Sequence, residues 1–287
     1  MNKVLIVGYG YLGRYLAKAE IQVGKQIEAL CRSKFEHPQI VSVTANLDDT
    51  DSLTELEVEQ KIVYYCAPPP SQGQHDPRIH NFLTAIGKQR PKRVVLISTT
   101  GVYGNCNGEW INETRPSNPQ ADRAHRRWSA EQRLMQWGET NGVKIVVLRV
   151  PGIYGTGKLP RKRLLSGQPV LAPEASPYSN RIQIEDLTQA CVAAAHHPEP
   201  KPLYNVADGH PSTMSDYFFQ VADALQLPRP KVITKEEMES QLSLGMRSYL
   251  AESKRIDNRL LREHLGVELK YPSLKEGLTA CLESPVI

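Results

Sequence analysis

The sequence predicts an α/β protein built on a doubly wound parallel sheet, and three observations predict it. Short apolar runs alternate with helical stretches through the first half of the chain. Each run is apolar at consecutive positions, as strands covered by helices on both faces require. A glycine-rich segment also joins the first run to a helix. This order is typical of repeated βαβ units.

Five apolar runs are expected to be the strands: residues 4–7, 27–31, 62–66, 94–98 and 145–150. Between the first two, Leu12, Tyr15, Leu16 and Ala19 recur at the spacing of one helix face. After Gly152, frequent prolines interrupt the chain, and helical segments are expected from about residues 185, 215 and 235. We therefore predict a dinucleotide-binding domain over residues 1–155. Residues 156–287 are predicted to form a smaller, mainly substrate-binding part, with some strands returning to the sheet.

Composition narrows the class of protein. With 287 residues, 40% hydrophobic and 23% charged, the chain is expected to fold into one large domain or two closely packed ones. The net charge of +4 is too small to indicate nucleic-acid binding. We find neither a secretory signal nor an apolar run of membrane-spanning length, so a cytoplasmic location without membrane attachment is expected. The five cysteines lack Cys-x-x-Cys spacing, which favours reduced thiols and no bound metal.

The glycine-rich segment carries the first functional prediction. Its letters fit G-x-G-x-x-G, directly after a strand and at the start of a helix. In that position glycines let the backbone approach a pyrophosphate at the helix N-terminus. The opposite interpretation, a glycine turn without a ligand, is disfavoured by this context. The residues expected to bind a dinucleotide are Gly8, Gly10, Tyr11, Leu12 and Gly13, together with Cys66 and Ala67 after the run 62–66.

The end of the second strand bears on the choice of dinucleotide. An Asp or Glu there would bind the ribose 2′-hydroxyl of NAD. This chain has Arg32 and Ser33 instead, which suit a 2′-phosphate. NADP is therefore favoured over NAD, which remains possible if Arg32 is only a solvated loop residue.

Four segments, together with the glycine loop, resemble the extended short-chain dehydrogenases of the NAD-dependent epimerase/dehydratase family. The resemblance extends over nearly the whole chain and implies a Rossmann-type sheet with a small C-terminal substrate-binding part. The segments are VVLISTTGVYG at 94–104, LRVPGIYG at 148–155, RIQIED at 181–186 and LYNVAD at 203–208.

The resemblance also implies an active site that this chain only partly has. The family uses a Tyr-x-x-x-Lys pair as acid/base and a Ser or Thr at the end of the fifth strand. Thr99 takes the Ser/Thr place, but counting from Pro119 puts Arg123 and Arg127 at the Tyr and Lys positions. An arginine stays protonated at neutral pH, so the usual proton donor is missing. Arg127 can still donate hydrogen bonds to the nicotinamide ribose.

Another side chain would then have to replace the missing tyrosine. Tyr103, near the end of the fifth strand, is the first candidate proton donor, with Arg127 lowering the pKa of its phenol. The letters Y-x-x-x-K also occur at Tyr154 and Tyr271, but glycines or a proline make helical spacing doubtful there. The residues expected at the catalytic centre are thus Thr99, Tyr103, Arg123 and Arg127.

Basic side chains indicate the kind of substrate. Arg123 and Arg127 fall on one helix face, and a second cluster occurs at residues 158–163. The two groups either converge on an anionic ligand or are separate solvated faces. Pro68, Pro69 and Pro70 form a stiff loop expected to shape the nicotinamide end of the site.

Two functions follow from these features. The first is an NAD(P)-binding, epimerase/dehydratase-like oxidoreductase that acts on a small anionic carbonyl or hydroxyl compound with atypical acid/base residues. The second is a non-catalytic NADP(H)-binding sensor or regulatory protein. In either case we expect a small-molecule ligand, no nucleic-acid partner and a homodimer as the possible assembly.

Overall fold

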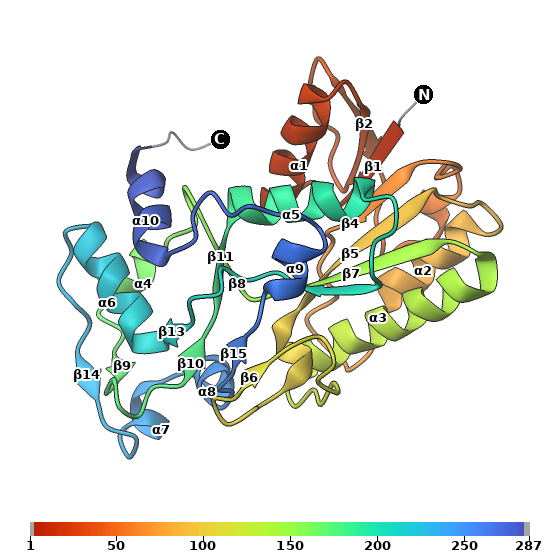
Figure 1. Ribbon diagram of the computed structural model, residues 1–287. Coiled ribbons are helices and arrows are strands. Elements are labelled where there is room, and N and C mark those ends of the chain that lie inside the picture. Colours follow the sequence, from red (N-terminus) through yellow and green to blue (C-terminus); the bar gives the residue numbers. More distant parts are fainter. Residues whose placement is uncertain (1–2, 284–287) are drawn as a thin grey trace.

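A computed structural model describes residues 3–283, and its centre is one parallel sheet (Figure 1). The strand order across the sheet is β12-β7-β5-β4-β1-β2-β3. The order reverses between β1 and β4, which confirms the predicted doubly wound Rossmann-type sheet. The strands are β1 (Lys3–Val7), β2 (Gln26–Cys31), β3 (Ile40–Thr44), β4 (Ile62–Tyr65), β5 (Arg93–Thr99), β7 (Lys144–Val150) and β12 (Leu203–Asn205).

The central strands are the ones that the sequence predicts best. All five predicted strands are confirmed, with ends that differ by at most one residue. Every residue of β4 is buried, and nearly every residue of β1, β5 and β7, so apolar runs at consecutive positions identify them. The strand β3 was not predicted from the sequence. It lies at the sheet edge with only Ile40 buried, so it lacks a continuous apolar run.

Helices cover both faces of the sheet and create two apolar cores. On one face, α1 (Tyr11–Gln22) and α5 (Ile184–His196) pack side by side, with α9 (Arg259–Glu263) near β12. On the other face lie α2 (Pro77–Ile86) and α3 (Asp122–Asn141) (Figure 1). Because α5, α9 and β12 come from beyond residue 156, the later part of the chain contributes both to the sheet layer and to the smaller lobe.

The smaller lobe lies on the left of Figure 1. Its core contains Tyr154, Tyr217, Phe218 and Leu278. Its helices are α4 (Arg161–Leu165), α6 (Met214–Ala224), α7 (Met238–Gln241), α8 (Leu244–Leu250) and α10 (Leu274–Glu283). Short strand pairs join its segments: β8 (Gly152–Tyr154) with β11 (Arg181–Gln183), β9 (Val170–Leu171) with β14 (Val232–Ile233), β10 (Tyr178–Ser179) with β13 (Ser212–Thr213), and β6 (Trp110–Ile111) with β15 (Arg255–Ile256).

The helices expected near residues 185 and 215 are confirmed as α5 and α6. The helical segment expected from about residue 235 begins at Met238 and is divided into two short helices, α7 and α8. Neither one buries a residue completely. Their apolar side chains Met238, Met246 and Leu250 are only partly buried, against a small core of Leu171, Ile233 and Leu242. Two 3-10 turns, η1 (Asp51–Leu53) and η2 (Thr100–Tyr103), complete the elements.

A buried ion pair ties α3 to the sheet. The guanidinium of Arg149 on β7 binds the carboxylate of Glu131 on α3 at 2.7 Å, and both side chains are only 4% exposed. Ser98 on β5 donates its hydroxyl to the same carboxylate, and Arg149 also donates to Ser117 Oγ at 2.8 Å. The charges are therefore satisfied inside the protein, where an unpaired one would be strongly destabilising.

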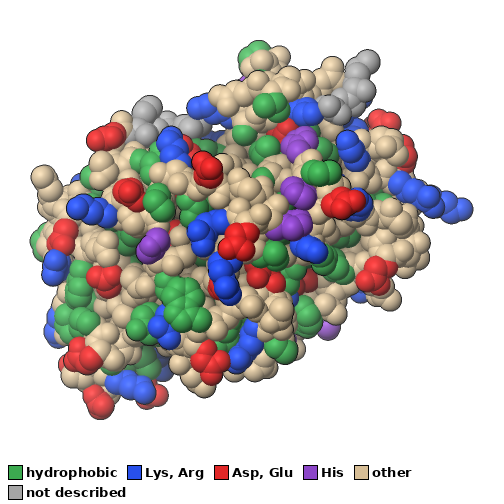
Figure 2. All heavy atoms as spheres, viewed as in Figure 1, with side chains coloured by type: hydrophobic (Ala, Val, Ile, Leu, Met, Phe, Trp, Pro, Cys, Tyr) green, Lys and Arg blue, Asp and Glu red, His purple; other side chains and the backbone are tan. Residues whose placement is uncertain are grey.

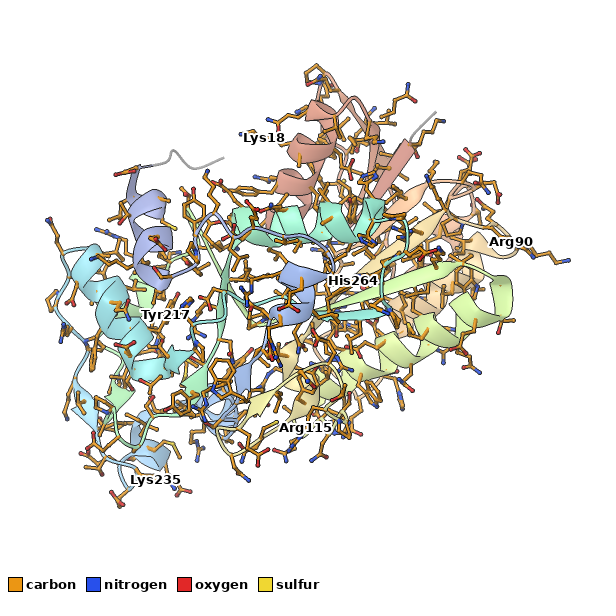
Figure 3. The ribbon with its side chains drawn as sticks, in the orientation of Figure 1. Lys18, Arg90, Arg115, Tyr217, Lys235 and His264 are labelled. Atoms are coloured by element: carbon orange, nitrogen blue, oxygen red, sulfur yellow. The ribbon has the colours of Figure 1, made fainter. Side chains whose placement is uncertain are left out.

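The surface shows no segregation of charge on the face seen in Figure 2, where acidic and basic side chains alternate. On the α5 side, Tyr204 and His264 meet through a hydrogen bond of 2.8 Å, and Figure 3 labels His264 there. Across residues 3–283, no helix combines the length and the apolar character needed to cross a membrane.

Candidate functional site

Two cavities lie at the carboxyl edge of the sheet and share Pro68 in their walls. The first has a volume of about 680 Å³ and adjoins the glycine loop. The second has a volume of about 580 Å³ and lies between the end of β5, α3 and the smaller lobe. The carboxyl edge, where the strand order reverses, is the usual ligand position in open α/β sheets.

Glycine occurs at the three positions of the loop for different structural reasons. Gly8 has φ of +96°, and a Cβ there would lie 2.7 Å from the backbone nitrogen of Ala67. A Cβ on Gly13 would lie 2.7 Å from the carbonyl oxygen of Gly8. Both are needed by the fold itself. A Cβ on Gly10 would have no described atom within 4 Å, so Gly10 leaves open space beside the cavity.

Gly10 is also the N-cap of α1, and among residues 3–283 no side chain caps this helix end. The backbone N–H groups of the first turn have no acceptor within a helix, and the helix dipole adds positive potential at this end. The open space at Gly10 lets a phosphate oxygen reach these groups. The loop therefore fits a pyrophosphate.

The polar wall of the first cavity is cationic. Arg14, Arg32, Lys34 and Arg78 line it, and none of its described lining residues is Asp or Glu. Arg78 is held by a two-point contact with Asp48, at 2.7 and 2.6 Å, and this contact lowers the pKa of the Asp48 carboxyl. The positive charge remaining at the end of β2 suits an anion.

Most of the predicted dinucleotide residues meet at this cavity. Its lining includes Gly8, Gly10, Arg32, Ser33, Cys66 and Ala67. Three of the residues predicted to bind the dinucleotide lie outside the wall of this cavity. The hydroxyl of Tyr11 donates to the carbonyl oxygen of Thr156 at 2.9 Å, and Leu12 is buried in the core. Gly13 packs against Gly8 beneath the loop rather than in the cavity wall.

The second cavity brings together three of the predicted catalytic residues. Thr99, Arg123 and Arg127 line it, together with Pro68 and Pro69 of the proline loop. Thr99 Oγ1 accepts a hydrogen bond from the Gly101 backbone at 3.1 Å. Its hydroxyl hydrogen can therefore point to a substrate oxygen.

Arg127 lies where the two cavities meet. Its Nη2 donates to the carbonyl oxygen of Ala67 at 3.0 Å, while its buried Nη1 has no hydrogen-bond partner among residues 3–283. Burial lowers the pKa of this guanidinium, and the nearby Asp76 carboxylate opposes that shift. This N–H is therefore available to donate a hydrogen bond to a ligand or to an ordered water.

Arg123 has a different role from the one expected. Its guanidinium donates to Ser248 Oγ at 2.6 Å, pairs with Glu252 at 3.3 Å and stacks 3.9 Å from the ring centre of Tyr249. All three partners lie on α8 or just after it. Arg123 is therefore an anchor that holds α8 at the rim of the second cavity.

Tyr103 lies outside both cavity walls, which argues against the proton-donor role expected for it. The residue is 1% exposed, and its hydroxyl donates to Asn205 Oδ1 at 2.8 Å. Arg149, not Arg127, is the cation over its ring, 4.5 Å from the centre. Burial raises the pKa of this phenol, and Arg149 opposes the shift. The position is that of a structural tyrosine.

The two Y-x-x-x-K tyrosines and the second basic cluster also lie away from this pair of cavities. Tyr154 is fully buried in the core of the smaller lobe, and Tyr271 is near Glu185. The basic cluster at residues 158–163 does not line the second cavity. Within it, Arg161 is exposed and Arg163 packs over Phe218. The two groups of cations therefore do not converge.

Sequence reasoning missed the far wall of the second cavity. This wall comes from the smaller lobe, and its polar residues include Tyr178, Asn180, Arg181, Tyr217, Tyr249, Glu252 and Lys254. Tyr217 belongs to α6, as Figure 3 shows. The residues are distant in sequence and follow no motif. The only available signal was the motif at 181–186, which begins with Arg181.

Asp208 lies behind this wall, and we expect its contribution to the free energy of unfolding to depend on pH. Burial raises the pKa of its carboxyl to about 6, and its Oδ2 has no partner among the described residues. Since the folded state holds this proton more tightly than the unfolded state, stability from this group falls as pH rises from about 4 to 6. We expect Asp208→Asn to be more stable than the wild type by about 1–3 kcal/mol at pH 7.

Urea unfolding at several pH values measures this difference. The advantage of Asp208→Asn should vanish near pH 4, where the wild-type carboxyl is protonated. A constant difference between pH 4 and pH 7 would show that the ionisation of Asp208 does not affect stability.

Comparisons with known proteins agree with this architecture. A model of the NAD dependent epimerase/dehydratase family matches residues 4–207. No curated protein matches the chain. Among solved structures, a conserved protein of unknown function from Silicibacter pomeroyi is 28% identical, with a TM-score of 0.78 over 99% of this chain and 100% of that one.

Two further structures are similar. One is a proposed NAD-dependent epimerase/dehydratase from Methylobacillus flagellatus, 25% identical, with a TM-score of 0.75 over 98% of this chain and 97% of the other. The second is the UDP-glucose 4-epimerase of Thermotoga maritima, 19% identical, with a TM-score of 0.80 over 98% and 97%. At that identity, the second likeness concerns the fold alone.

Proposed function

The chain belongs to the NAD dependent epimerase/dehydratase family, and from this premise we propose that it is an oxidoreductase that binds a nicotinamide dinucleotide along the carboxyl edge of its sheet. The observation that carries this proposal is the pair of cavities that meet at Pro68. One has a phosphate-type loop and a cationic wall, and the other has Thr99 and Arg127. An extended dinucleotide with a separate substrate beside it needs this arrangement.

Different residues would bind different parts of the dinucleotide. Gly8, Gly10 and the first turn of α1 would receive the pyrophosphate. Arg127, with its unpartnered Nη1, would donate to the nicotinamide ribose. When bound, the nicotinamide supplies hydride transfer to or from a substrate carbon.

We propose that NADP is preferred to NAD. Arg32 and Lys34 line the first cavity at the end of β2, where an NAD-specific site has an acidic residue. A charged hydrogen bond from Arg32 to the 2′-phosphate is worth roughly 1.5–3 kcal/mol. The family is described as NAD dependent, so this preference is a property that we assign to the present chain.

Binding of the two dinucleotides tests this assignment. We expect calorimetry to show NADP bound about tenfold or more tightly than NAD. Arg32→Ala should remove most of the difference by weakening NADP alone. Arg161→Ala removes an exposed arginine of α4 and is the matched control, which should leave both affinities unchanged. Equal affinities of the wild type for NAD and NADP would contradict the preference.

The proton chemistry must differ from the Tyr-x-x-x-Lys scheme. Arg123 and Arg127 remain protonated at neutral pH, so neither one exchanges a proton with substrate. Thr99 and Arg127 can orient a substrate oxygen and stabilise negative charge that develops on it. We propose a small anionic carbonyl or hydroxyl substrate, whose oxygen exchanges its proton with water.

A non-catalytic NADP(H) sensor is the second candidate, favoured by the anchoring of α8 through Arg123 at the Tyr position. The two functions differ in turnover. An oxidoreductase should oxidise NADPH with at least one compound from a panel of carbonyl-containing carboxylates. Tight NADPH binding with no turnover across the panel would favour the sensor.

A further inference from the structure

Arg181 is a buried cation in the wall of the second cavity. It begins β11 and is 9% exposed. Its Nη1 donates to the carbonyl oxygen of Asn180 at 2.6 Å, and its Nη2 contacts Met214 Sδ at 3.4 Å. Its guanidinium stacks 4.1 Å from the ring centre of Tyr217. A guanidinium has more N–H donors than these contacts use.

The charge of Arg181 has no direct counter-ion. Among the described residues, no carboxylate oxygen lies within 4.0 Å of it. Asp208 attracts Arg181 from a greater distance, but the two form neither a hydrogen bond nor an ion pair. Burial lowers the pKa of this guanidinium. A buried cation that faces a cavity under these conditions is satisfied best by an anionic ligand.

Backbone geometry makes room for this side chain. Gly152 on β8 pairs with Arg181 on β11. A Cβ at Gly152 would lie 3.1 Å from Arg181 Cδ and 3.2 Å from its Nη1. A Cβ at residue 152 would therefore require the end of the Arg181 side chain to shift by a few tenths of an ångström. Gly152 does not have a positive φ, so its backbone conformation does not require glycine. The close approach of the Arg181 side chain is the reason for a small residue at this position.

The other cations of the cavity have different surroundings. Arg123 and Lys254 both pair with Glu252, at 3.3 and 2.6 Å. Arg127 lies at the opposite end, beside Ala67. Apolar side chains of the smaller lobe complete the wall: Ile153, Met214 and Met246. This end of the cavity therefore combines the buried guanidinium of Arg181, which has no carboxylate partner among the described residues, with surfaces suited to a carbon chain.

We propose that Arg181 anchors the carboxylate of an organic monoanion whose carbon chain lies along the apolar wall. One guanidinium balances one negative charge and matches the planar geometry of a carboxylate. The apolar side chains beside the guanidinium favour the carbon chain of an organic acid over inorganic phosphate. The assignment rests on the proposed function and refines it by naming the substrate class and the residue that selects it.

Titration of small carboxylates tests this assignment without turnover. The probes are butyrate, benzoate and inorganic phosphate, each added to the full chain in calorimetry, with and without saturating NADP. We expect saturable binding of a carboxylate, weakened about tenfold or more by Arg181→Gln and less by Arg181→Lys. Arg161→Gln, which removes an exposed charge, should bind as the wild type does.

Gly152→Ala is a second test, since it crowds the Arg181 side chain without removing its charge. It should weaken carboxylate binding while leaving the affinity for NADP unchanged. Thermal unfolding of each variant shows whether its fold is intact.

Three outcomes would overturn the proposal: no carboxylate binding by the wild type, equal binding by Arg181→Gln, or tighter binding of phosphate through Arg181. Failure of the proposed function has a different signature, because NADP would then not bind while carboxylates still would.

Discussion

Gly10→Val should abolish dinucleotide binding and leave the fold unchanged. The glycine has an ordinary extended backbone, and no described atom lies within 4 Å of the position of a Cβ. A valine side chain therefore projects into the first cavity rather than into the protein, where it blocks the approach of a pyrophosphate to the first turn of α1. We expect calorimetry to show a loss of at least about 100-fold in affinity, roughly 2.7 kcal/mol.

Two other glycines give the controls. Gly245 on α8 also has open space around its Cβ position, so Gly245→Val should fold and bind normally. Gly8→Val should destabilise the protein itself, because its Cβ would meet the backbone of Ala67 at 2.7 Å. If Gly10→Val binds as tightly as the wild type, the pyrophosphate is held elsewhere and the interpretation of the loop is wrong.

Glu131→Gln should produce the largest loss of stability. The change leaves the guanidinium of Arg149 buried without its counter-charge, and the side chain of Glu131 is as buried as its partner. Removing one member of such a pair costs about 3–5 kcal/mol. Urea unfolding should show a lower free energy of unfolding at an unchanged slope.

The exposed pair of Glu109 and Arg115 is the matched control. Its side chains are 56% and 40% exposed, so water already solvates both charges. Glu109→Gln should therefore change the free energy of unfolding by no more than about 1 kcal/mol. A similar small change in Glu131→Gln would show that Arg149 finds another partner when the carboxylate is lost.

The burial of an element explains whether the sequence could predict it. Central strands such as β5 are buried on both faces, so their apolar runs stand out without any knowledge of their neighbours. The edge strand β3 has one buried residue and needs its partner β2 to be recognised. The short helices α7 and α8 bury no residue fully, so periodicity gave no basis for their boundaries.

The same distinction applies to the site. Most of the first cavity comes from local segments, because the glycine loop and residues 31–35 each follow a strand at one edge of the sheet. The second cavity draws its walls from β5, α3, β11, α6 and α8, and only the fold brings them together. Sequence spacing could place Arg123 on the correct helix, but its partners on α8 lie more than a hundred residues away.

The anchoring of α8 by Arg123 constrains how this chain can evolve. Replacement of Arg123 by tyrosine would restore a phenol at the position that the family resemblance assigns to the acid/base. The same replacement removes the hydrogen bond to Ser248 and the ion pair with Glu252. Gain of one function and loss of another are thus coupled at a single codon. Substitutions that give α8 new contacts would therefore have to come first. Only then could Arg123 be replaced by tyrosine without loss of the anchor.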